Sequence, residues 1–580
     1  MNRRIVGVLV ALITLCLFGV LLSSNGLTKA FNSFYVSDEE WSSIIESRSE
    51  NQELDISSLK FNGYPLSIAG STVYYSIVEN DFHDLNPLVS FSTTYQLAVH
   101  GEQISQDSIE HNRSIEFVIY NKNEFRKFEL VSTTLPILNM TFDNASGEAP
   151  STREDESFHM SLFDNRSKAI QRVILSDGQA HRRGNVSFGA QKPNLALKLT
   201  QESVGENTRS NPQELLGMQM NDNWILSGMY YDYEKVRDAF AAKLWSNLNE
   251  NSFNVTNDYE FRYVEVIMNG DYCGLYLLGT KPSPNSILSE VPDEEHPDIM
   301  FKIEEGDDIG SFITGQTNIL KYYKQETDVD DKIATEILRE YFESIFGDDN
   351  LAIESSVDMQ NAVDFHLFTN FSQNLDIPRG GLAGYKNCYI SFKWDGEKYR
   401  AIFTPWDFDI ALGSNNLFGG YYDLLPDLNT VLDNDSIAAL RRNGSGSADR
   451  LIQTRYFTLR QAALSNSKID ALIDELEKDI YNSGAFRRNM ERWTESKHGD
   501  PEIKLNDFRT HIHKRLEYLD SYYALGDSES LKEAYFEVPN FVTEYLKTGI
   551  LLSPDDPNYY TKQEPVANEG GLGLEPVFWQ

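Results

Sequence analysis

Hydrophobic positions in the first part of the chain recur with the period of β-strands. Segments rich in β-branched and aromatic residues, with polar breaks between them, fill residues 31–133 and include 71–77, 88–97 and 115–120. This spacing predicts a small β-sandwich-like domain. No catalytic cluster stands out within it, so we expect the domain to bind a partner or to act as a spacer.

Residues 134–526 combine strand patterns with helical periodicity and therefore predict an α+β fold. Apolar residues at three- and four-residue spacing predict helices at 233–247, 329–346, 359–371, 447–465, 469–481 and 503–523. Asp232 is placed to cap the first of these helices. In this division, residues 527–580 are a C-terminal tail that contains a glycine-rich stretch.

Two turn signals predict hairpins in the second part. Asn269-Gly270 lies between the strand-like segments 261–268 and 272–278, and Asn-Gly is the strongest short-range hairpin signal. Asp395-Gly396 lies between the segments 389–394 and 397–403. We expect both connections to be two-residue turns.

The second hairpin brings the candidate catalytic and metal-binding residues together. A two-residue turn would place Trp394 opposite Glu397 and Asn387 opposite Thr404. It would therefore return the run Pro405-Trp-Asp407-Phe-Asp409 to the end of the hairpin at which Asn387 lies. The loop before the hairpin holds Asp376, next to Pro378 and a glycine pair.

An isolated aspartate, an amide and a carboxylate pair are the groups that phosphoryl transfer requires. One carboxylate orients the attacking hydroxyl, and an Asn and an Asp hold the divalent metals that neutralise the phosphates. Protein kinases supply these groups in the same order, although the HRD and DFG motifs themselves do not occur here. The structural alternative is a solvated acidic turn, or a calcium loop that uses Asp407 and Asp409.

The first 30 residues have the pattern of a targeting segment. Arg3 and Arg4 precede an apolar run that ends near Leu22, with Gly26 or Ala30 as candidate cleavage edges. The run is also long enough to be an uncleaved membrane anchor. In both cases the arginines predict that the rest of the chain is exported, and we expect membrane contact only through this segment.

Composition narrows the set of partners. The formal net charge of −37 disfavours a nucleic-acid partner and an anionic lipid surface, because phosphate binding needs clustered Lys and Arg. Outside the targeting segment the cysteines are Cys273 and Cys388. Two cysteines exclude a disulfide scaffold and leave open one bridge between them, but the interpretation we favour is that both are small buried residues.

Dispersed motifs from residue 135 to residue 523 resemble those of the CotH family of spore-coat protein kinases. Arg183-Gly-Asn185-Val-Ser187 is similar to the RGNxS motif of the family, and Leu197-Lys198-Leu is similar to its strand lysine. The resemblance continues, in order along the chain, through Trp224-Ile-Leu with Asp232 and Arg237, Val264-Glu-Val with Asn269-Gly-Asp-Tyr-Cys-Gly274-Leu-Tyr276, Asp376, Asn387, and Pro405-Trp-Asp407-Phe-Asp409 with Gly413.

The resemblance implies an atypical, reduced protein-kinase-like domain with a helical C-terminal part. It implies binding of ATP with Mg or Mn and phosphorylation of serine, or threonine, in exported proteins such as spore-coat components. The implied roles are phosphate binding by Lys198, orientation of the acceptor hydroxyl by Asp376, metal ligation by Asn387 and Asp407 with Asp409 as a further ligand, and either cleft lining or strand locking by Arg183, Asn185 and Ser187.

One departure from the family pattern bears on activity. The family commonly has an acidic residue after the Gly-x-Tyr-x-Leu segment, whereas Leu278-Gly279-Thr280-Lys281 contains none. Glu265, Glu234 and Glu304 are candidate substitutes. The alternative function is therefore a catalytically degenerate kinase-fold protein that acts in coat assembly or surface binding. An adhesin led by the β-rich domain is a third hypothesis.

Overall fold

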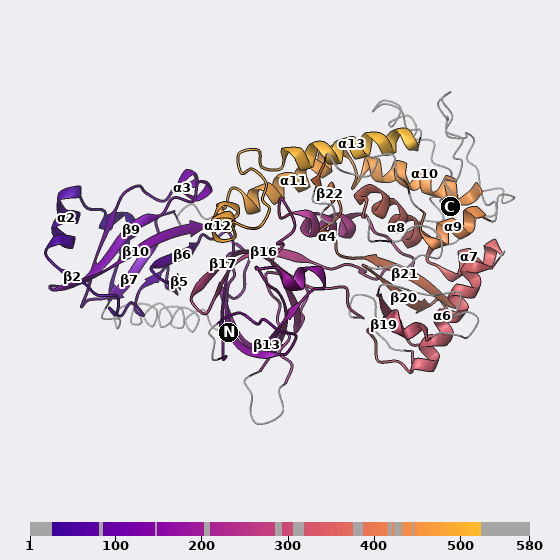
Figure 1. Cartoon of the computed structure of the whole chain (residues 1–580), viewed down its shortest axis with the longest axis horizontal. Coiled ribbons are helices and arrows are strands. Elements are labelled where there is room, and N and C mark those ends of the chain that lie inside the picture. The colour runs from indigo at the N-terminus through magenta and orange to yellow at the C-terminus, as the bar shows by residue number, and fades with distance from the viewer. Residues whose placement is uncertain are drawn as a thin grey trace, which may run out of the picture.

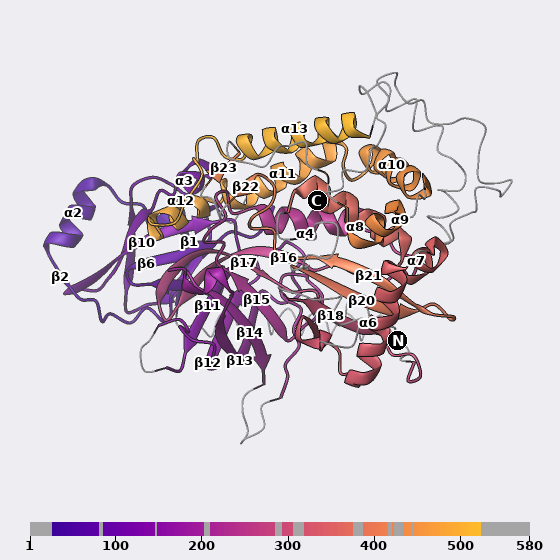
Figure 2. The same ribbon diagram turned by 45° about the vertical axis from the view of Figure 1, so that its right-hand side comes forward.

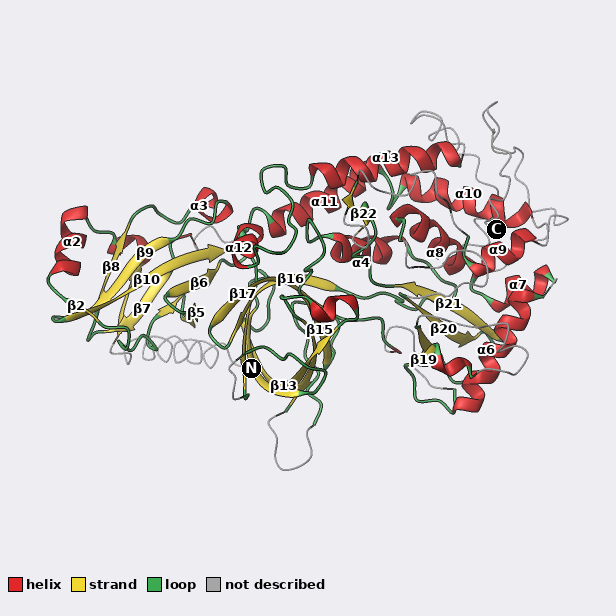
Figure 3. Cartoon of the chain, viewed as in Figure 1, coloured by secondary structure: helices red, strands yellow, loops and turns green. Residues whose placement is uncertain are grey.

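The computed structural model describes residues 26–80, 85–144, 148–201, 209–284, 293–304, 318–347, 349–374, 377, 387–415, 420–422, 431, 433–442 and 446–523. Along its longest axis, a β-rich region is followed by a β-barrel and then by a region of helices and sheet (Figures 1 and 3). This mixture confirms the predicted α+β class. The predicted targeting segment, apart from its last five residues, and the predicted C-terminal tail lie outside the described residues.

The β-rich region contains two sheets around a common apolar core. One sheet has the order β1-β7-β3-β4, the other β5-β6-β10-β9-β8, with β2 pairing to β10. Phe31, Val73 and Phe117 are fully buried in the shared core, which is the packing that the strand pattern predicts. The elements are β1 Gly26–Ala30, η1 Phe31–Phe34, α2 Asp38–Glu46, β2 Ser49–Glu50, β3 Lys60–Phe61, β4 Tyr64–Pro65, β5 Ser67–Ala69, β6 Thr72–Ser76, β7 Leu88–Ser92, β8 Gln96–His100, α3 Gln106–Glu110, β9 Ile115–Tyr120 and β10 Glu124–Thr133.

The central region is a closed barrel with the order β11-β12-β13-β14-β15-β17-β16, a closure that the local pattern does not predict. Leu195, Leu197 and Leu199 of β14 point into its apolar interior, so Lys198 between them faces outward. The strands are β11 Ile137–Phe142, β12 Glu156–Phe163, β13 Val173–Arg183, β14 Asn194–Thr200, β15 Asn223–Ser227, β16 Phe261–Met268 and β17 Asp271–Gly279, and η3 Val186–Gly189 precedes β14.

The last region packs helices against a four-stranded sheet and against the outer face of the barrel. One apolar core runs from Tyr263 and Leu277 of the barrel through Phe240 and Trp245 of α4 into the other helices. Figure 2 shows α11 and α13 above α4 and α8. The sheet has the order β19-β18-β20-β21. The elements are α4 Arg237–Leu248, β18 Ile299–Ile303, η5 Ile319–Lys321, β19 Tyr323–Gln325, α6 Asp331–Phe346, α7 Asn350–Ser356, α8 Met359–Ser372, β20 Cys388–Trp394, β21 Tyr399–Pro405, β22 Ser414–Asn415, β23 Gly420–Tyr421, α9 Asp435–Arg442, α10 Gly446–Gln461, α11 Asn466–Ile480, α12 Ala485–Arg492 and α13 Asn506–Tyr522.

The predicted hairpin at Asn269-Gly270 is confirmed. Met268 pairs with Asp271, which leaves a two-residue connection. Both connecting residues have positive φ, 50° for Asn269 and 76° for Gly270. Left-handed backbone at both central positions matches the twist of the flanking strands, and Asn and Gly are the residues that adopt it most readily.

The predicted register of the second hairpin is wrong by two residues. Trp394 pairs with Tyr399, so the connection contains four residues. The cause is Asp395, whose Oδ1 accepts hydrogen bonds from the backbone N–H groups of Glu397 and Lys398, both 2.9 Å, while its Oδ2 accepts one from Arg400 at 2.6 Å. A shift of two residues keeps every side chain on its expected face.

Helix α4 begins later than predicted. The sequence pattern predicts a start at residue 233, but the helix begins at Arg237 because Lys235 has a φ of 65°, which is not helical. Asp232 nevertheless caps the first turn, since its Oδ2 accepts a hydrogen bond from the Arg237 backbone N–H at 2.8 Å. The chain between them makes a loop that still reaches the helix end.

Short helix α12 joins the barrel to the β-rich region. Arg488 forms a buried ion pair with Glu265 of β16, and its Nη1 donates to the Asn112 side chain at 3.1 Å. Gly274 of β17 has a φ of 94°, and a Cβ there would lie 2.7 Å from the Asn489 side chain. Several residues of the Val264-to-Tyr276 motif therefore serve this packing.

The two cysteines are buried free thiols and form no disulfide with each other. Cys273 belongs to the barrel and Cys388 to the four-stranded sheet, where each fills a small apolar space. This confirms the interpretation as packed residues. Among the described residues, which begin at residue 26, no helix has the length and apolar character to cross a bilayer.

We expect Arg488→Met to lower the free energy of unfolding by about 3–5 kcal/mol, because it leaves the buried Glu265 carboxylate without its cation. Arg487 is the neighbouring control. It forms an ion pair with Glu502, whose side chain is 72% exposed, so Arg487→Met should cost well under about 1 kcal/mol. Denaturant unfolding of both variants checks this expectation. Equal losses would contradict it.

Candidate active site

Asn387 and Asp407 lie together at the open end of the β20–β21 hairpin. The Trp406 backbone N–H donates to the Asn387 carbonyl oxygen at 2.8 Å, which sets Asn387 beside the start of the acidic run. Asn387 has a φ of 56° and Asp407 a φ of 63°. Left-handed backbone is costly for residues other than glycine and concentrates at functional sites. The surrounding structure must therefore hold Asn387 and the turn at Asp407 in place.

Helix α8 and the residues after it hold the turn from one side. The Asn374 side-chain amide donates to the Asp407 carbonyl oxygen at 2.8 Å. Phe408 is fully buried against Phe368 of α8, with ring centroids 5.3 Å apart. The Leu412 N–H then donates to the Ser372 carbonyl at 2.7 Å. The backbone on both sides of Asp409 is thereby fixed.

Asp238 in the first turn of α4 holds the turn from the other side. Its Oδ1 accepts a hydrogen bond from the Phe408 N–H at 2.8 Å. Burial, and after it the negative charge of Asp407, raise the pKa of Asp238 to about 7, whereas the Phe408 hydrogen bond and Arg183 act in the opposite direction. Two carboxylates thus share a site that would be stabilised by a cation.

Sequence reasoning missed Asp238. In the sequence it resembles an ordinary acidic residue near a helix N-terminus, and its partner Phe408 is 170 residues away. The only local signal is its position directly after Arg237, a residue of the family-like motif.

Arg183, at the end of β13, is close enough to the site for its charge to act there. Its positive charge lowers the pKa of Asp238 and also that of buried Tyr389 in β20. The pKa of Tyr389 lies above its usual range because of burial and then the charge of Glu326, with smaller contributions from Glu304 and Asp407. A cation and several carboxylates therefore surround the end of β20.

A buried ion network supports the segment that follows the acidic run. Arg237 of α4 is fully buried and pairs with Asp232 and with Glu234, the latter at 2.6 Å. Its Nε donates to the Ala411 carbonyl oxygen at 3.1 Å. The Tyr422 hydroxyl donates to Glu234 at 2.6 Å. Asp232 and Arg237, both noted in the sequence, thus act as structural support.

The remaining candidates are placed differently. Lys198 is exposed on β14, and its side chain has no hydrogen bond or ion pair among the described residues. Asn185 is exposed in the turn after Arg183, and the Ser187 hydroxyl accepts a hydrogen bond from the Asn194 side chain at 3.0 Å, which locks the turn against β14. Asp409 is half-buried next to Asp407. Asp376 lies outside the described residues.

The three acidic residues that the sequence offers as substitutes have different surroundings. Glu265 is held by Arg488, and Glu234 is held by Arg237. Glu304 is close enough to Tyr389 for its charge to raise the pKa of that hydroxyl. Glu326, which the sequence did not suggest, acts on it in the same way and forms a 2.6 Å ion pair with Lys281 of the non-acidic segment.

The donor set fits a hard divalent cation. Carboxylate and amide oxygens are the ligands that Mg²⁺ and Mn²⁺ take. Asn387, just before β20, and Asp407, just after β21, supply both kinds at the open end of the hairpin. Within the described part of the chain no group of three or more His, Cys, Asp or Glu side chains could hold a metal ion. Asp376 is not among the residues to which that statement applies.

Comparison with known proteins gives one result. A family model described as CotH kinase protein matches residues 180–519. The chain belongs to this family. The match covers more than half of the 580 residues and contains every residue of the candidate site, from Arg183 to Asp409. The β-rich region lies outside it, and no curated protein matches the chain.

We expect Asp238→Leu to weaken binding of Mn²⁺ with ATP by about tenfold, because the Phe408 N–H loses its acceptor and the Asp407 turn loosens. Asp238→Asn keeps an acceptor oxygen and should bind within about threefold of the wild type. Titration of Mn²⁺ by electron paramagnetic resonance, with ATP present, checks both variants. An Asn variant as weak as the Leu variant would show that the charge of Asp238, rather than its hydrogen bond, matters.

Proposed function

We propose that the protein is an exported protein kinase that depends on ATP and a divalent metal and phosphorylates serine or threonine of secreted, coat or envelope proteins. The observation that carries this proposal is that Asn387 and Asp407 lie together at the open end of the β20–β21 hairpin. The charge of Arg183, at the end of β13, acts on the same site. Membership of the CotH kinase family supports it.

The order of the elements also supports the proposal. A strand with an outward lysine, β14, is followed by a helix, α4, then by a hairpin, β16–β17, and finally by the region that carries the metal-binding candidates. Protein kinases place their phosphate-binding lysine, their regulatory helix and their metal-binding Asp in the same order. The likeness is one of order and roles.

In the proposed reaction, Asn387 and Asp407 would hold Mg or Mn, with Asp409 as a further ligand. When bound, the metal would neutralise the charge on the phosphates of ATP. Arg183 binds a phosphate group, and Asp376 orients the acceptor hydroxyl and takes its proton. Asn387, Asp407 and Arg183 belong to separate elements, so their geometry depends on the packing described above.

Arg183 and Lys198 are not equivalent in this proposal. In the register of β13 and β14, Arg183 pairs with Asn194 and Gln179 pairs with Lys198. Arg183 and Lys198 therefore lie on the same face of the two strands, which is the outer face of the barrel. Four residues along a strand separate Asn194 from Lys198, which corresponds to roughly 13 Å. Arg183 is at the end close to Asp238, so we assign it the phosphate contact that the family resemblance gave to Lys198, and we give Lys198 a second, outer contact.

An exported location rests on the sequence of the first 30 residues, whose arginines and apolar run have the pattern of a signal peptide or an anchor. We propose that the kinase acts outside the cytoplasm, in the secreted fraction, the spore coat or the cell envelope. Its acceptor would be a protein with accessible serines.

One specific observation favours the second candidate function, that of a degenerate kinase-fold protein. Lys281 lies in the segment where the family commonly has an acidic residue. It forms an ion pair with Glu326, one of the acidic residues near Tyr389. If that ion pair closes the nucleotide site, the protein would be a degenerate kinase-fold protein for coat assembly or surface binding. Incubation with labelled ATP, Mg or Mn and a serine-rich acceptor separates the two functions, since only the kinase transfers label.

We expect Asp407→Asn and Asp376→Asn to fail in different ways. Asp407→Asn should weaken metal-dependent ATP binding and transfer together, because it removes a metal ligand. Asp376→Asn should leave ATP affinity within a few-fold and lower transfer by about a hundredfold or more. Calorimetric titration of ATP with Mg, run beside a transfer assay, tests this division. Equal losses of ATP binding would refute it.

The two cations give a matched comparison. Arg183→Leu should raise the Kd for ATP by about tenfold or more, since a charge-assisted contact to phosphate is lost. Lys198→Leu should change it by about threefold or less. The same titration measures both constants, and ADP serves as a control ligand with fewer phosphate charges. A larger effect of Lys198→Leu would reverse the assignment.

A further inference from the structure

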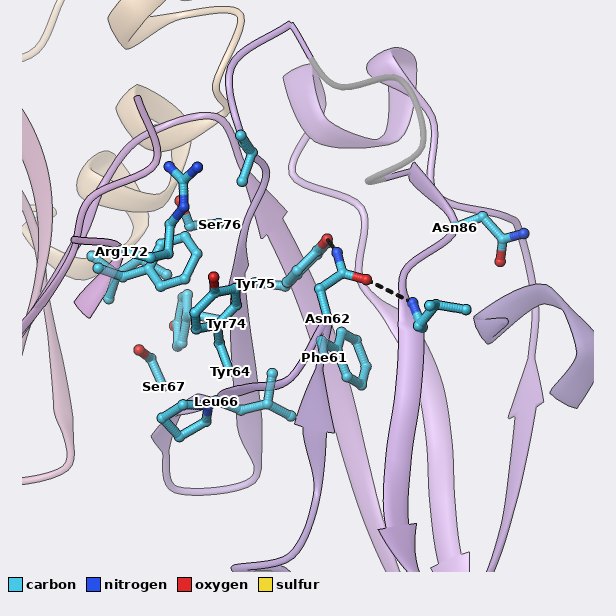
Figure 4. Close-up of a pocket in the computed structure, with 15 residues that line it drawn as sticks. Phe61, Asn62, Tyr64, Leu66, Ser67, Tyr74, Tyr75, Ser76, Asn86 and Arg172 are labelled. Carbon is cyan, nitrogen blue, oxygen red and sulfur yellow. Dashed lines mark hydrogen bonds between the residues drawn. The ribbon is translucent and has the colours of Figure 1, made fainter. Parts of the chain in front are cut away.

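A cavity of about 600 Å³ lies between the β-rich region and the barrel. Strands β3 to β7 of the β-rich region form one wall, and the other wall carries Ile137, Phe163 and Arg172 of the barrel region. It shares no residue with the candidate active site. Figure 4 shows the lining residues, among them Arg172 of the barrel region and Tyr64, Tyr74 and Asn62 of the β-rich region.

Aromatic rings form much of the lining. Tyr64 contacts Phe163 edge to face, with centroids 5.6 Å apart, and is itself 36% exposed. Tyr74 stacks on Tyr272 of the barrel at 4.7 Å, nearly parallel, which fixes the plane of its ring. Small-molecule sites of 300 to 1,000 Å³ are typically lined in this way, with a few polar groups that set orientation.

The polar groups of the lining are held in place before any ligand binds. The Asn62 side chain donates to the Tyr75 hydroxyl at 3.2 Å and accepts from the Leu88 N–H at 2.8 Å, as the dashed lines in Figure 4 mark. Asn62 has a φ of 50°, so these contacts stabilise a turn as well as a wall. A preformed wall lowers the entropic cost of binding.

Arg172 brings a guanidinium group without an ion-pair partner among the described residues to the lining of the cavity. Its Nη1 donates to the carbonyl oxygens of Asp164 at 2.7 Å and of Arg166 at 2.6 Å. The Asp164 carboxylate is occupied by the Arg166 side chain. Among the described residues Arg172 forms no ion pair, although the chain as a whole carries a net charge of −37. Backbone carbonyl groups therefore orient the guanidinium through Nη1.

We propose that this cavity binds a small molecule that has a flat apolar ring and one carboxylate. The ring would lie against Tyr64 and Tyr74, since aromatic faces and edges favour flat apolar partners. The carboxylate would meet Arg172, whose planar guanidinium matches that geometry. Because both walls contribute, the ligand joins the β-rich region to the barrel. This site is independent of the proposed kinase activity.

The test uses 2-naphthoate and its neutral amide, 2-naphthamide, as probes of the full chain by calorimetric titration. We expect one saturable naphthoate site with at least about tenfold preference over the amide, as an Arg–carboxylate contact provides. Arg172→Leu should abolish the preference. Tyr64→Ala, at a partly exposed ring, should weaken both probes and leave their ratio unchanged.

Arg48→Leu is the matched control. Arg48 also lies in the β-rich region and also donates to backbone carbonyls, those of Asn121 at 2.7 Å and Ile44 at 3.1 Å, but it does not line the cavity. The Arg48→Leu variant should bind both probes as the wild type does. Absence of saturable naphthoate binding, equal affinity for the amide, or equal losses in the Arg48 and Arg172 variants would overturn the proposal. Melting curves of each variant show whether it is folded.

Discussion

The candidate site depends on one strained turn being held from three directions. Asp407 has a left-handed backbone. Hydrogen bonds with Asp238 of α4, with Asn374 just after α8 and with Asn387 just before β20 fix residues 406–408. None of these contacts is local in sequence. A conformation that is costly by itself persists here because the packing of three separate elements determines it.

That dependence explains why so many of the family-like motif residues are not at the site. Glu265 and Gly274 bind or contact α12, and Asp232 with Arg237 supports Ala411. These residues set the position of the barrel and of α4 relative to the hairpin. A buried ion pair is weak evidence for stability but does fix a specific arrangement when both partners are satisfied. We interpret the motifs as the frame of the site, with Arg183 and Asp407 among the groups that use it.

The sequence predicted what depends on local pattern and missed what depends on distant contacts. The helices α6 and α8 appear within two residues of their expected starts, and the Asn269-Gly270 turn is as predicted, because periodicity and turn chemistry are local signals. The start of α4 and the second hairpin register were wrong, since the conformation of Lys235 and the hydrogen bonds of Asp395 override the pattern. Barrel closure and Asp238 could not be found, because both arise from tertiary contacts. Asp376 lies outside the described residues, so its role stays a prediction.

The central claim is that Asn387 and Asp407 hold the metal of a nucleotide site that Arg183 completes. Crystals soaked with Mn²⁺ and a non-hydrolysable ATP analogue, measured at the manganese absorption edge, test it most directly. The account predicts an anomalous peak within ligand distance of the Asn387 and Asp407 oxygens, roughly 2.2 Å, with a phosphate group next to Arg183. A nucleotide bound elsewhere, or a manganese peak that lacks Asp407 as a ligand, would contradict it.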